Sequence, residues 1–521
     1  MDAKPATITS GAHESVEKAI GEIRAHCDQC IAFCTGTHEL KDFYSIEADL
    51  KKHVFYFGCL ILKLYLLVAQ QRLNYTKWLE SGLYYLKSKP SGRTIKTFFG
   101  EVRYWRNYLV RKGEHGGGCF PLDIALGLTR DGFSPLVIKL VTKLATRMSF
   151  GSSVLLFKCF CSWTPSSEAI EHLVIGLGRQ ASAYMEVAHC VEDDGEVLII
   201  ECDGKATPTA TEEELSKRRK KRKCKKKGCN CQRHRGQAKR KCCKRRRRKK
   251  GDKSKNGRST TIIVMYTLKR GPDGLLHGPI NKKVWASYAP RKVMFAWARR
   301  QATRRGFPPG TDKRIHIAVD GEKCLKDRLS ELFPEATFTL DIRHVEEKIW
   351  KIGRAFYKEG SKELESWVET KRTFLYEGCA SDLVSDLKDM KAKLSSRAKR
   401  DKHKRAILEE VIKYMEPRLE MMNYKKYLEE DLPIASGIVE GAARYVVGER
   451  MDCSGMRWIP GRAEALLQLR CIELNKDWDK FFGWVYERWK VKLRGNEKVI
   501  IRSNKPIDLT SYSTSAIPYG V

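Results

Sequence analysis

Two short stretches decide the fold, LIIECDGKATP at residues 198–208 and RIHIAVDGEKC at residues 314–324. Each begins with strand-forming apolar residues and then reaches an aspartate followed by a glycine, Asp203–Gly204 and Asp320–Gly321. The apolar runs predict two buried strands, each ending at its aspartate. Because an ionised side chain is rarely placed next to a buried strand without a partner, these two aspartates are candidates for a functional site.

The segments around these stretches predict an α/β fold. Strands are expected over 260–270, 282–289 and 336–342, and helices over 291–305 and 322–332. Three strands, a helix, a strand, a helix and a strand is the order of an RNase H-like core, a mixed five-stranded sheet flanked by helices. In that core the fourth strand lies beside the first. Residues 346–431 are helical, charged and too long for a loop, which predicts an inserted helical subdomain.

The N-terminal region is predicted to be mainly helical with a small β element. Helices are expected over 14–34, 46–73 and 134–190, and strands over 84–112. The strands would form either a packed hairpin or a nucleic-acid platform that uses Tyr104, Trp105, Arg106 and Tyr108.

Two short helical patterns lie on either side of CSWTPSS, residues 161–167, where Thr164 and Pro165 suit the start of the second helix. The pair predicts either simple packing or a helix-turn-helix DNA reader. The candidate DNA contacts in it are Lys158, His172 and Arg179.

These patterns divide the chain into successive parts. They are an N-terminal helical region (1–82), a small β-rich element (83–130), a helical region with the helix-turn-helix candidate (131–192), a catalytic domain (193–345 with 432–495), a basic arm inserted after its first strand (211–259), a helical insertion (346–431) and a C-terminal tail (496–521).

The charge of the chain favours a polyanionic partner. The chain has 99 Lys and Arg against 63 Asp and Glu, a formal net charge of +36. Residues 217–250 hold 22 of these cations and no acid, so the remainder carries 77 − 63 = +14. The arm is expected to be disordered in isolation, yet its cations, including Arg245, Arg246, Arg247 and Arg248, would attract DNA phosphates.

Eighteen cysteines at scattered spacings indicate a reducing cytosol. The most apolar segment, 54–69, is short for a membrane span and contains Lys63, so it is interpreted as a core helix and no membrane partner is expected.

Two cysteine clusters raise the question of zinc. Cys27, Cys30, Cys34 and His38 fall at helical spacing and are interpreted as one packed helix face. In the arm, the candidate zinc ligands are Cys224, Cys229, Cys231 and His234, but their spacing matches no paired CxxC pattern, which favours an arm without metal.

Carboxylates at the ends of two adjacent strands suggest metal chemistry. Two such charges repel unless a cation is shared between them, and Mg²⁺ prefers oxygen ligands. A third ligand is predicted at Glu440 in SGIVEGAARYVVGER, where Ser436 would cap a helix and Gly437 and Gly441 would allow close approach to the sheet. The alternative is that Glu440 is an ordinary surface glutamate.

Four motifs follow one another along the chain, namely DG, DG, DIRH and, at residues 433–470, PIASGIVEGAARYVVGERMDCSGMRWIPGRAEALLQLR. Their order resembles that in the DDE transposases of bacterial insertion sequences, specifically the Kra-four family. The resemblance runs from about residue 195 to residue 490, and PLDIALGL extends it weakly toward the N-terminus. It implies an RNase H-like catalytic domain with the triad Asp203, Asp320 and Glu440. It also implies two Mg²⁺ (or Mn²⁺) ions, endonucleolytic cleavage at element ends, and DNA recombination by attack of the freed 3′ hydroxyl on target DNA.

The resemblance also implies supporting residues and partners. Asp341 and His344 fit the DxxH of Mutator-type transposases, as site support or as strand-end capping. By their positions after Glu440, Arg444, Arg450 and Arg457 are candidate phosphate contacts, with the alternative that Arg444, four residues after Glu440, neutralises that carboxylate. Trp458 would either stack on a base or belong to the core. Transposition implies double-stranded DNA as partner, self-association on DNA and a cytoplasmic, nucleoid-associated protein.

Two other functions remain open. An RNase H-like nuclease or resolvase would use the same metals without strand transfer. A domesticated DNA-binding protein would need neither magnesium nor Glu440.

Overall fold

The computed structural model describes residues 7–9, 14–36, 40–113, 117–161, 163–188, 194–214, 257–321, 323–453, 456–495 and 497–512. The chain divides into two compact units, of which the first comprises Met1–Tyr184 with Lys476–Ile507 and the second Met185–Asn475 with Asp508–Val521.

The first unit begins with two long helices and two small sheets, which confirms the helices predicted over 14–34 and 46–73 and the strands predicted over 84–112, whereas the strand Thr7–Thr9 and the helix Thr76–Leu79 were not predicted. The helices are α1 (Val16–Thr35), α2 (Phe43–Arg72) and α3 (Thr76–Leu79). One sheet has the order β1 (Thr7–Thr9), β4 (Glu101–Arg106), β3 (Ser91–Lys96), and the other has the order β2 (Tyr84–Leu86), β5 (Leu109–Arg111), β6 (Gly118–Cys119).

Helix α2 buries only part of its surface. Cys59, Leu60 and Leu66 belong to a core cluster that also contains residues of β4, whereas Phe43 and Tyr44 are exposed. Lys63, 2% exposed, forms ion pairs with Glu14 and Glu22. By length and composition, α2 is the one helix in the described part of the chain that could cross a membrane, and 22% of its most apolar window is buried.

The platform suggested for the strands does not form as proposed. Tyr104 is buried, and its hydroxyl donates to Asp123 at 2.9 Å. Arg106 pairs with the same carboxylate and lies over the ring of Phe120. The side chains of Tyr104 and Arg106 therefore contact other residues of the unit, which favours the hairpin interpretation for these two residues.

The remaining helices of the first unit are α4 (Pro121–Ala125), α5 (Pro135–Arg147), α6 (Phe150–Phe160), α7 (Ser167–Val187, whose last three residues lie in the second unit) and α21 (Trp478–Arg494). Three of them, α5, α6 and α7, lie in the helical zone predicted over 134–190, and α4 and α21 lie outside it. The predicted start of α7 at Thr164 and Pro165 is wrong, because the hydroxyl of Ser166 accepts from the Ala169 N–H at 3.1 Å and caps the helix.

The second unit is built on a mixed five-stranded sheet. Its order is β11 (Thr337–Leu340), β10 (Arg314–Val319), β7 (Val197–Thr207), β8 (Arg258–Arg270), β9 (Leu276–Ser287). Strands β11, β10 and β7 pair in parallel, and β8 is antiparallel to both of its neighbours. The expectation that the fourth strand of this core lies beside the first is confirmed.

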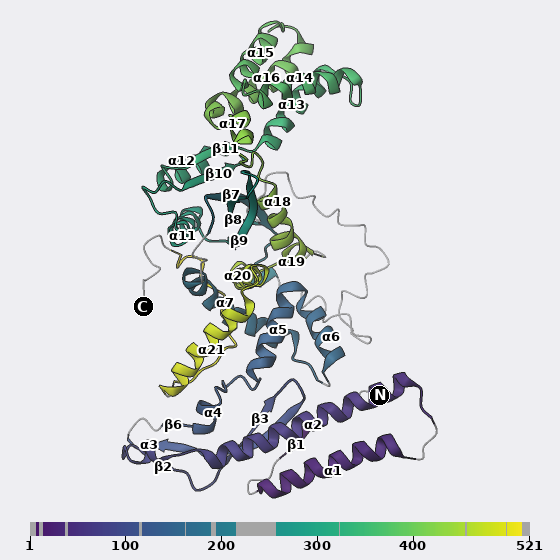
Figure 1. Ribbon diagram of the computed structural model, residues 1–521, viewed down its shortest axis with the longest axis vertical. Helices are drawn as coiled ribbons and strands as arrows, with labels where there is room; N and C mark the ends of the chain where they lie inside the picture. The colour runs from purple at the N-terminus through teal and green to yellow at the C-terminus, as the bar shows by residue number, and fades with distance from the viewer. Residues whose placement is uncertain are drawn as a thin grey trace, which may run out of the picture. The chain divides into compact units, whose positions relative to one another are not determined.

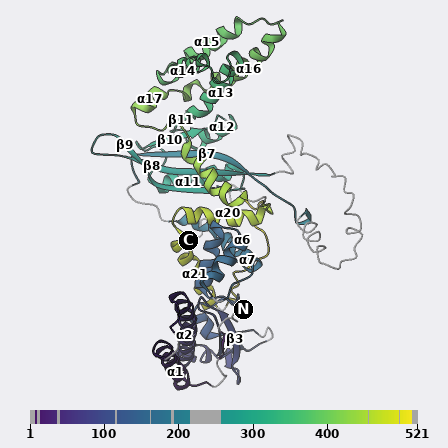
Figure 2. The ribbon, with the colours of Figure 1, turned by 90° about the vertical axis from the view of Figure 1, so that its right-hand side faces the viewer.

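Helices lie on both sides of this sheet. Figure 1 shows α11 (Arg291–Arg304) and α12 (Lys323–Leu332) on one side and α18 (Gly437–Ala442), the π-helical segment η3 (Ala443–Gly448) and α19 (Glu449–Met451) on the other. Helix α20 (Pro460–Leu474) packs on β9. The view in Figure 2 shows the long strands β7, β8 and β9 side by side.

The predicted end of the first strand is wrong. Strand β7 continues past Asp203 to Thr207, and Asp203 and Gly204 pair with Ile262 and Thr261 of β8. Antiparallel bonding to β8 therefore keeps the chain extended beyond the last residue paired with β10. Asp320 directly follows β10, as predicted.

The predicted helical insertion is present. It contains α13 (Ile342–Phe356), α14 (Lys362–Tyr376), α15 (Ala380–Ala392), α16 (Lys399–Met415), the 3₁₀ segment η2 (Glu416–Met421) and α17 (Tyr424–Glu429). The hydroxyls of Tyr424 and Tyr427 donate to the carbonyls of Leu340 and Phe338, which ties the end of the insertion to β11.

A buried ion pair anchors the start of β7. Asp194, 1% exposed, pairs with Arg305 and accepts from the Thr267 hydroxyl at 3.1 Å and the Asn281 amide at 2.7 Å. The partners come from β8, from β9 and from the end of α11, so one carboxylate joins three elements of the unit.

We expect Asp194→Ala to destabilise the second unit by about 3–5 kcal/mol, because the Arg305 guanidinium would remain buried without its counter-charge. Chemical denaturation followed by circular dichroism measures the change. Asp312→Ala, at an exposed position, is the control and should change stability by less than about 0.5 kcal/mol. Equal effects of the two substitutions would contradict an anchoring role for Asp194.

Candidate active site

The pairing of β7 with β10 brings two aspartates together. The last paired residues are Glu201 and Ala318. Asp203 and Asp320 lie two residues farther along their strands, so continuing the register places them opposite one another at the edge where the two strands separate. Both residues are half-buried.

The environment of Asp203 disfavours its negative charge. Burial is the main cause that raises the pKa of Asp203, and the charge of Asp320 raises it further. The Gly204 N–H, which donates to Asp203 Oδ1 at 2.6 Å, and the nearby His344 act in the opposite direction without cancelling the rise. A divalent cation between the two carboxylates would relieve this repulsion.

The turn that carries Asp320 is held by the helical insertion. The Tyr414 hydroxyl donates to the carbonyl of Asp320 at 3.0 Å, and Arg418 Nε donates to the carbonyl of Gly321 at 2.9 Å. Gly321 has a φ of +83°, and a Cβ at this position would lie 2.5 Å from the Tyr414 hydroxyl oxygen. Sequence reasoning missed both side chains, because no local pattern links them to a turn more than ninety residues away.

Asp341 supports the site from a fully buried position. It is the N-cap of α13, and its Oδ1 accepts from the Arg343 N–H at 2.8 Å. Its Oδ2 accepts from the backbone N–H of Ser436 at 3.1 Å and from the Ser436 hydroxyl. Ser436 is the N-cap residue of α18, as predicted, but its hydroxyl donates to Asp341 and makes no cap hydrogen bond to the helix.

Glu201 holds the helix that carries Glu440. Its Oε2 accepts from the Val439 N–H in the first turn of α18 at 2.8 Å, and its Oε1 accepts from the Tyr266 hydroxyl at 2.8 Å. Burial is the main cause that raises the pKa of Glu201 to about 6, against the effect of these hydrogen bonds. Sequence reasoning missed this residue, although an acid inside the apolar run LIIEC was the available signal.

Glu440 is exposed on α18, close to His344 and Asp341. Each of these three side chains offers a ligand atom within 4.8 Å of the other two. Asp203 and Asp320 lie outside this group, but Asp203 is within electrostatic reach of both Asp320 and His344. The five side chains therefore gather at one edge of the sheet, from β7, β10, α13 and α18.

The donor set suits a divalent cation with a preference for oxygen. Four of the five residues are carboxylates, which Mg²⁺ or Mn²⁺ would accept, and the fifth is an imidazole. Asp341 already accepts hydrogen bonds at both of its oxygens, so the exposed Glu440 and the half-buried Asp203 and Asp320 are better placed as ligands.

The predicted role of two glycines near Glu440 is wrong. A Cβ added to Gly437 would meet no atom within 4 Å, and one added to Gly441 would reach only the Tyr445 ring at 4.0 Å. Helix α18 therefore approaches the sheet through Val439 and Ala442, which are buried, and not through its glycines.

The candidate DNA contacts that follow Glu440 separate into two groups. Arg444 is exposed and Arg457 is half-buried. Arg450 is 1% exposed and its guanidinium lies over the Trp458 ring at 5.1 Å, so its assignment as a surface phosphate contact is wrong. Trp458 is half-buried, and its indole N–H donates to the carbonyl of Met451 at 2.8 Å.

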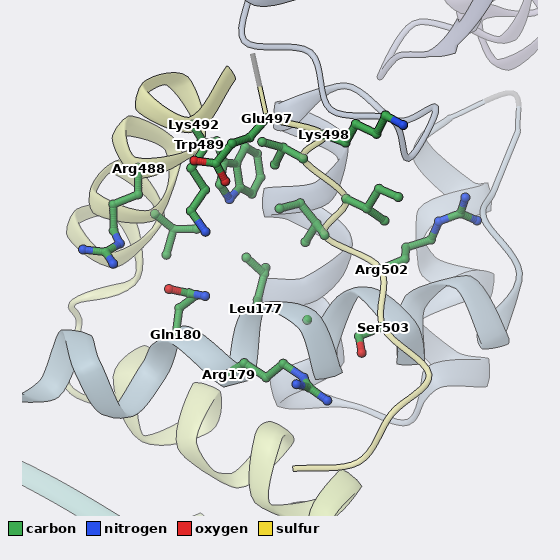
Figure 3. Close-up of a pocket in the computed structure, with 15 residues that line it drawn as sticks. Leu177, Arg179, Gln180, Arg488, Trp489, Lys492, Glu497, Lys498, Arg502 and Ser503 are labelled. Carbon is green, nitrogen blue, oxygen red and sulfur yellow. The ribbon is translucent and has the colours of Figure 1, made fainter. Parts of the chain in front are cut away.

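In the first unit, Arg179 lines a basic pocket between α7, α21 and the segment 497–503 (Figure 3). The lining includes the cations Arg179, Arg488, Lys492, Lys498 and Arg502 and the single acid Glu497. One nitrogen of Arg179 donates to the carbonyl of Lys505 at 2.6 Å, which fixes its guanidinium at the rim of the pocket. Lys158 lies on α6, and His172 accepts at its backbone carbonyl from the Ser503 N–H.

Part of the predicted site lies outside the described residues. This applies to the arm cations Arg245, Arg246, Arg247 and Arg248 and to the zinc candidates Cys224, Cys229, Cys231 and His234.

Comparison with known proteins does not assign the chain to a family. No protein-family model matches the chain, and no curated protein matches it.

The raised pKa of Glu201 predicts a pH-dependent contribution to stability. The folded-state pKa, about 6, exceeds the ordinary value of 4.5, so folding favours the protonated carboxyl group. The stabilisation that Glu201 gives to the folded state is therefore complete below pH 4.5 and is lost as the pH rises through 6. The loss amounts to about 2 kcal/mol. Denaturant unfolding of wild type and Glu201→Gln from pH 4 to 7 measures it as a difference, and the same pH slope in both proteins would contradict it.

Asp341 and His344 should respond differently to substitution. Asp341→Ala removes hydrogen bonds to a buried carboxylate and should destabilise the second unit by about 3 kcal/mol. His344→Ala should change stability by less than about 1 kcal/mol but weaken Mn²⁺ binding about 10–100-fold. Denaturation and a Mn²⁺ titration separate the two effects, and unchanged Mn²⁺ affinity in His344→Ala would place this imidazole outside the metal site.

Proposed function

We propose that the chain is a DNA transposase of the DDE type, which cleaves element ends by metal-dependent phosphodiester hydrolysis and joins the 3′ hydroxyl to target DNA. The observation that carries the proposal is the meeting of Asp203 and Asp320 across the parallel strands β7 and β10, with Glu440 carried on a helix docked to β7. The sheet order β11-β10-β7-β8-β9, in which β8 runs opposite to the other four strands, supports an RNase H-like core.

Asp203, Asp320 and Glu440 would hold two Mg²⁺ ions. Bound there, the ions would activate the attacking oxygen and stabilise the leaving oxygen of an in-line displacement. The protein itself would keep these three carboxylates at fixed positions. Strand pairing fixes Asp203, the Tyr414 and Arg418 contacts fix the Asp320 turn, and the Glu201 contact orients the first turn of α18.

Cationic side chains near the site would receive the DNA backbone. Arg444 is exposed one turn after Glu440. Arg291 begins α11, and one of its terminal nitrogens lies 3.6 Å from the position of a Cβ on Gly204, beside Asp203. Phosphate contacts of this kind would position the duplex without reading its sequence. The net charge of +36 would add long-range attraction that weakens as salt increases.

The proposal extends to partners and location. Joining two element ends requires both to be held in one complex, so the protein is proposed to self-associate on DNA. We also propose that the protein is associated with the nucleoid in a bacterial cytoplasm, where its DNA substrate would be. The two alternative functions, a nuclease or resolvase and a DNA-binding protein without catalytic activity, are tested by the same experiment.

The test is a cleavage and strand-transfer assay on duplex DNA carrying the sequences that flank the gene, in Mg²⁺. We expect Asp203→Asn, Asp320→Asn and Glu440→Gln each to bind this DNA with unchanged affinity and to lose cleavage about 10³-fold or more, because each would remove a charge that the transition state needs. Asp327→Asn, at an exposed position on α12, is the matched control and should retain full activity.

Each other outcome would identify a different function. Cleavage without joining would identify a nuclease or resolvase. Binding without any metal-dependent cleavage in wild type would identify a DNA-binding protein. Full activity of Glu440→Gln would remove Glu440 from the site and contradict the proposed triad.

A further inference from the structure

Three metal-ligating side chains meet between the two N-terminal helices, far in sequence from the carboxylate site. His26 and Cys30 lie four residues apart on α1 and therefore share one face of that helix. His53 lies on α2. The three side chains each offer a ligand atom within 4.8 Å of the other two.

The distances within this His26–Cys30–His53 cluster are short. Cys30 Sγ lies 3.7 Å from His26 Nε2, and the imidazole rings of His26 and His53 have centroids 5.3 Å apart. Aromatic side chains surround the cluster. The ring of Tyr56 contacts His26 edge-on at 4.8 Å, and the ring of Phe33 lies 5.3 Å from that of His53.

Hydrogen bonding leaves the His26 ring incompletely satisfied. The residue is 4% exposed, and its Nδ1 has no hydrogen-bond partner among the described residues. Its Nε2 lies 3.1 Å from the carbonyl of His53 and also faces the Cys30 thiol. A neutral imidazole nitrogen cannot donate to that carbonyl and accept from that thiol at once, and buried polar atoms are normally paired.

We propose that His26, Cys30 and His53 bind a zinc ion. Tetrahedral zinc holds sulfur at about 2.3 Å and nitrogen at about 2.0–2.1 Å, which puts neighbouring S and N ligands about 3.6 Å apart. The 3.7 Å between Cys30 Sγ and His26 Nε2 fits this value. One thiolate and two imidazoles also select zinc over magnesium. Three protein ligands leave a fourth position, which water can take on the side of the half-buried Cys30 and His53.

A zinc ion at this cluster would fasten α1 to the rest of the first unit. Among the described elements, α1 packs chiefly on α2. The Lys63 ion pairs with Glu14 and Glu22 hold one part of this contact, and the metal cluster would hold another. Because metal binding adds to the stability of the folded state, zinc should stabilise the docking of α1.

The structure corrects the earlier interpretation of the cysteines on α1. Cys27 and Cys34 are exposed, so the proposed single packed face is wrong for them, and His38 lies outside the described residues. Only Cys30 faces the histidines. The signal in the sequence was the spacing of His26 and Cys30, but their partner His53 lies on another helix and is not revealed by spacing.

The test measures zinc in the full-length chain after dialysis against metal-free buffer. Cys224, Cys229, Cys231, Cys242 and Cys243 of the arm are first changed to serine, so that retained metal reports on the helices. We expect about one zinc per chain in this parent protein. Cys30→Ser and His53→Gln should each reduce it to near zero, and Cys27→Ser, the matched control one turn away on the exposed side, should leave it unchanged.

Replacing zinc with Co²⁺ gives a second readout. The parent should show a sulfur-to-cobalt charge-transfer band that disappears in Cys30→Ser and persists in Cys27→Ser. Circular dichroism checks that the variants keep their helices. No retained zinc in a folded parent, or equal zinc in the parent and Cys30→Ser, would overturn the proposal. Neither result depends on DNA cleavage, so the zinc site can be contradicted without affecting the proposed transposase activity, and the reverse is also true.

Discussion

The parallel hydrogen bonding between β7 and β10 is the constraint on which the candidate active site depends. Its register carries Asp203 and Asp320 to the same edge of the sheet. A slip of one residue would turn one of the two side chains to the opposite face, because side chains alternate along a strand. The longer antiparallel pairing with β8 keeps β7 extended after β10 has left it, so Asp203 has a rigid backbone and an open side.

Two buried carboxylates support this arrangement from the interior of the second unit. Glu201 and Asp341 are both fully buried, and each accepts hydrogen bonds from the segment that leads into α18 or from its first turn. Buried acids are costly unless they are hydrogen-bonded. Here each of them binds N–H and O–H donors, so its burial orients the helix that carries Glu440. The supporting acids lie in positions where an apolar residue would pack but could not orient a helix.

The two units contain different kinds of candidate metal ligands. The second unit gathers carboxylates around one imidazole, a set that suits a hard cation. The first unit gathers a thiol and two imidazoles between helices, a set that suits zinc. The oxygen-rich site is open to solvent at Glu440, whereas His26 at the other site is buried.

The sequence by itself determined the order of strands and helices, the long helical insertion and the position of an aspartate after each of two apolar runs, because apolar periodicity and turn residues are local. The basic charge also predicted a polyanionic partner. Only the tertiary structure decided that β7 runs past Asp203, that Ser436 binds Asp341, that Arg450 is buried, and that Tyr414 and Glu201 hold the site. It alone brought His53 to His26 and Cys30. These contacts join residues distant in sequence, and their energies depend on burial and hydrogen-bond geometry that no local pattern contains.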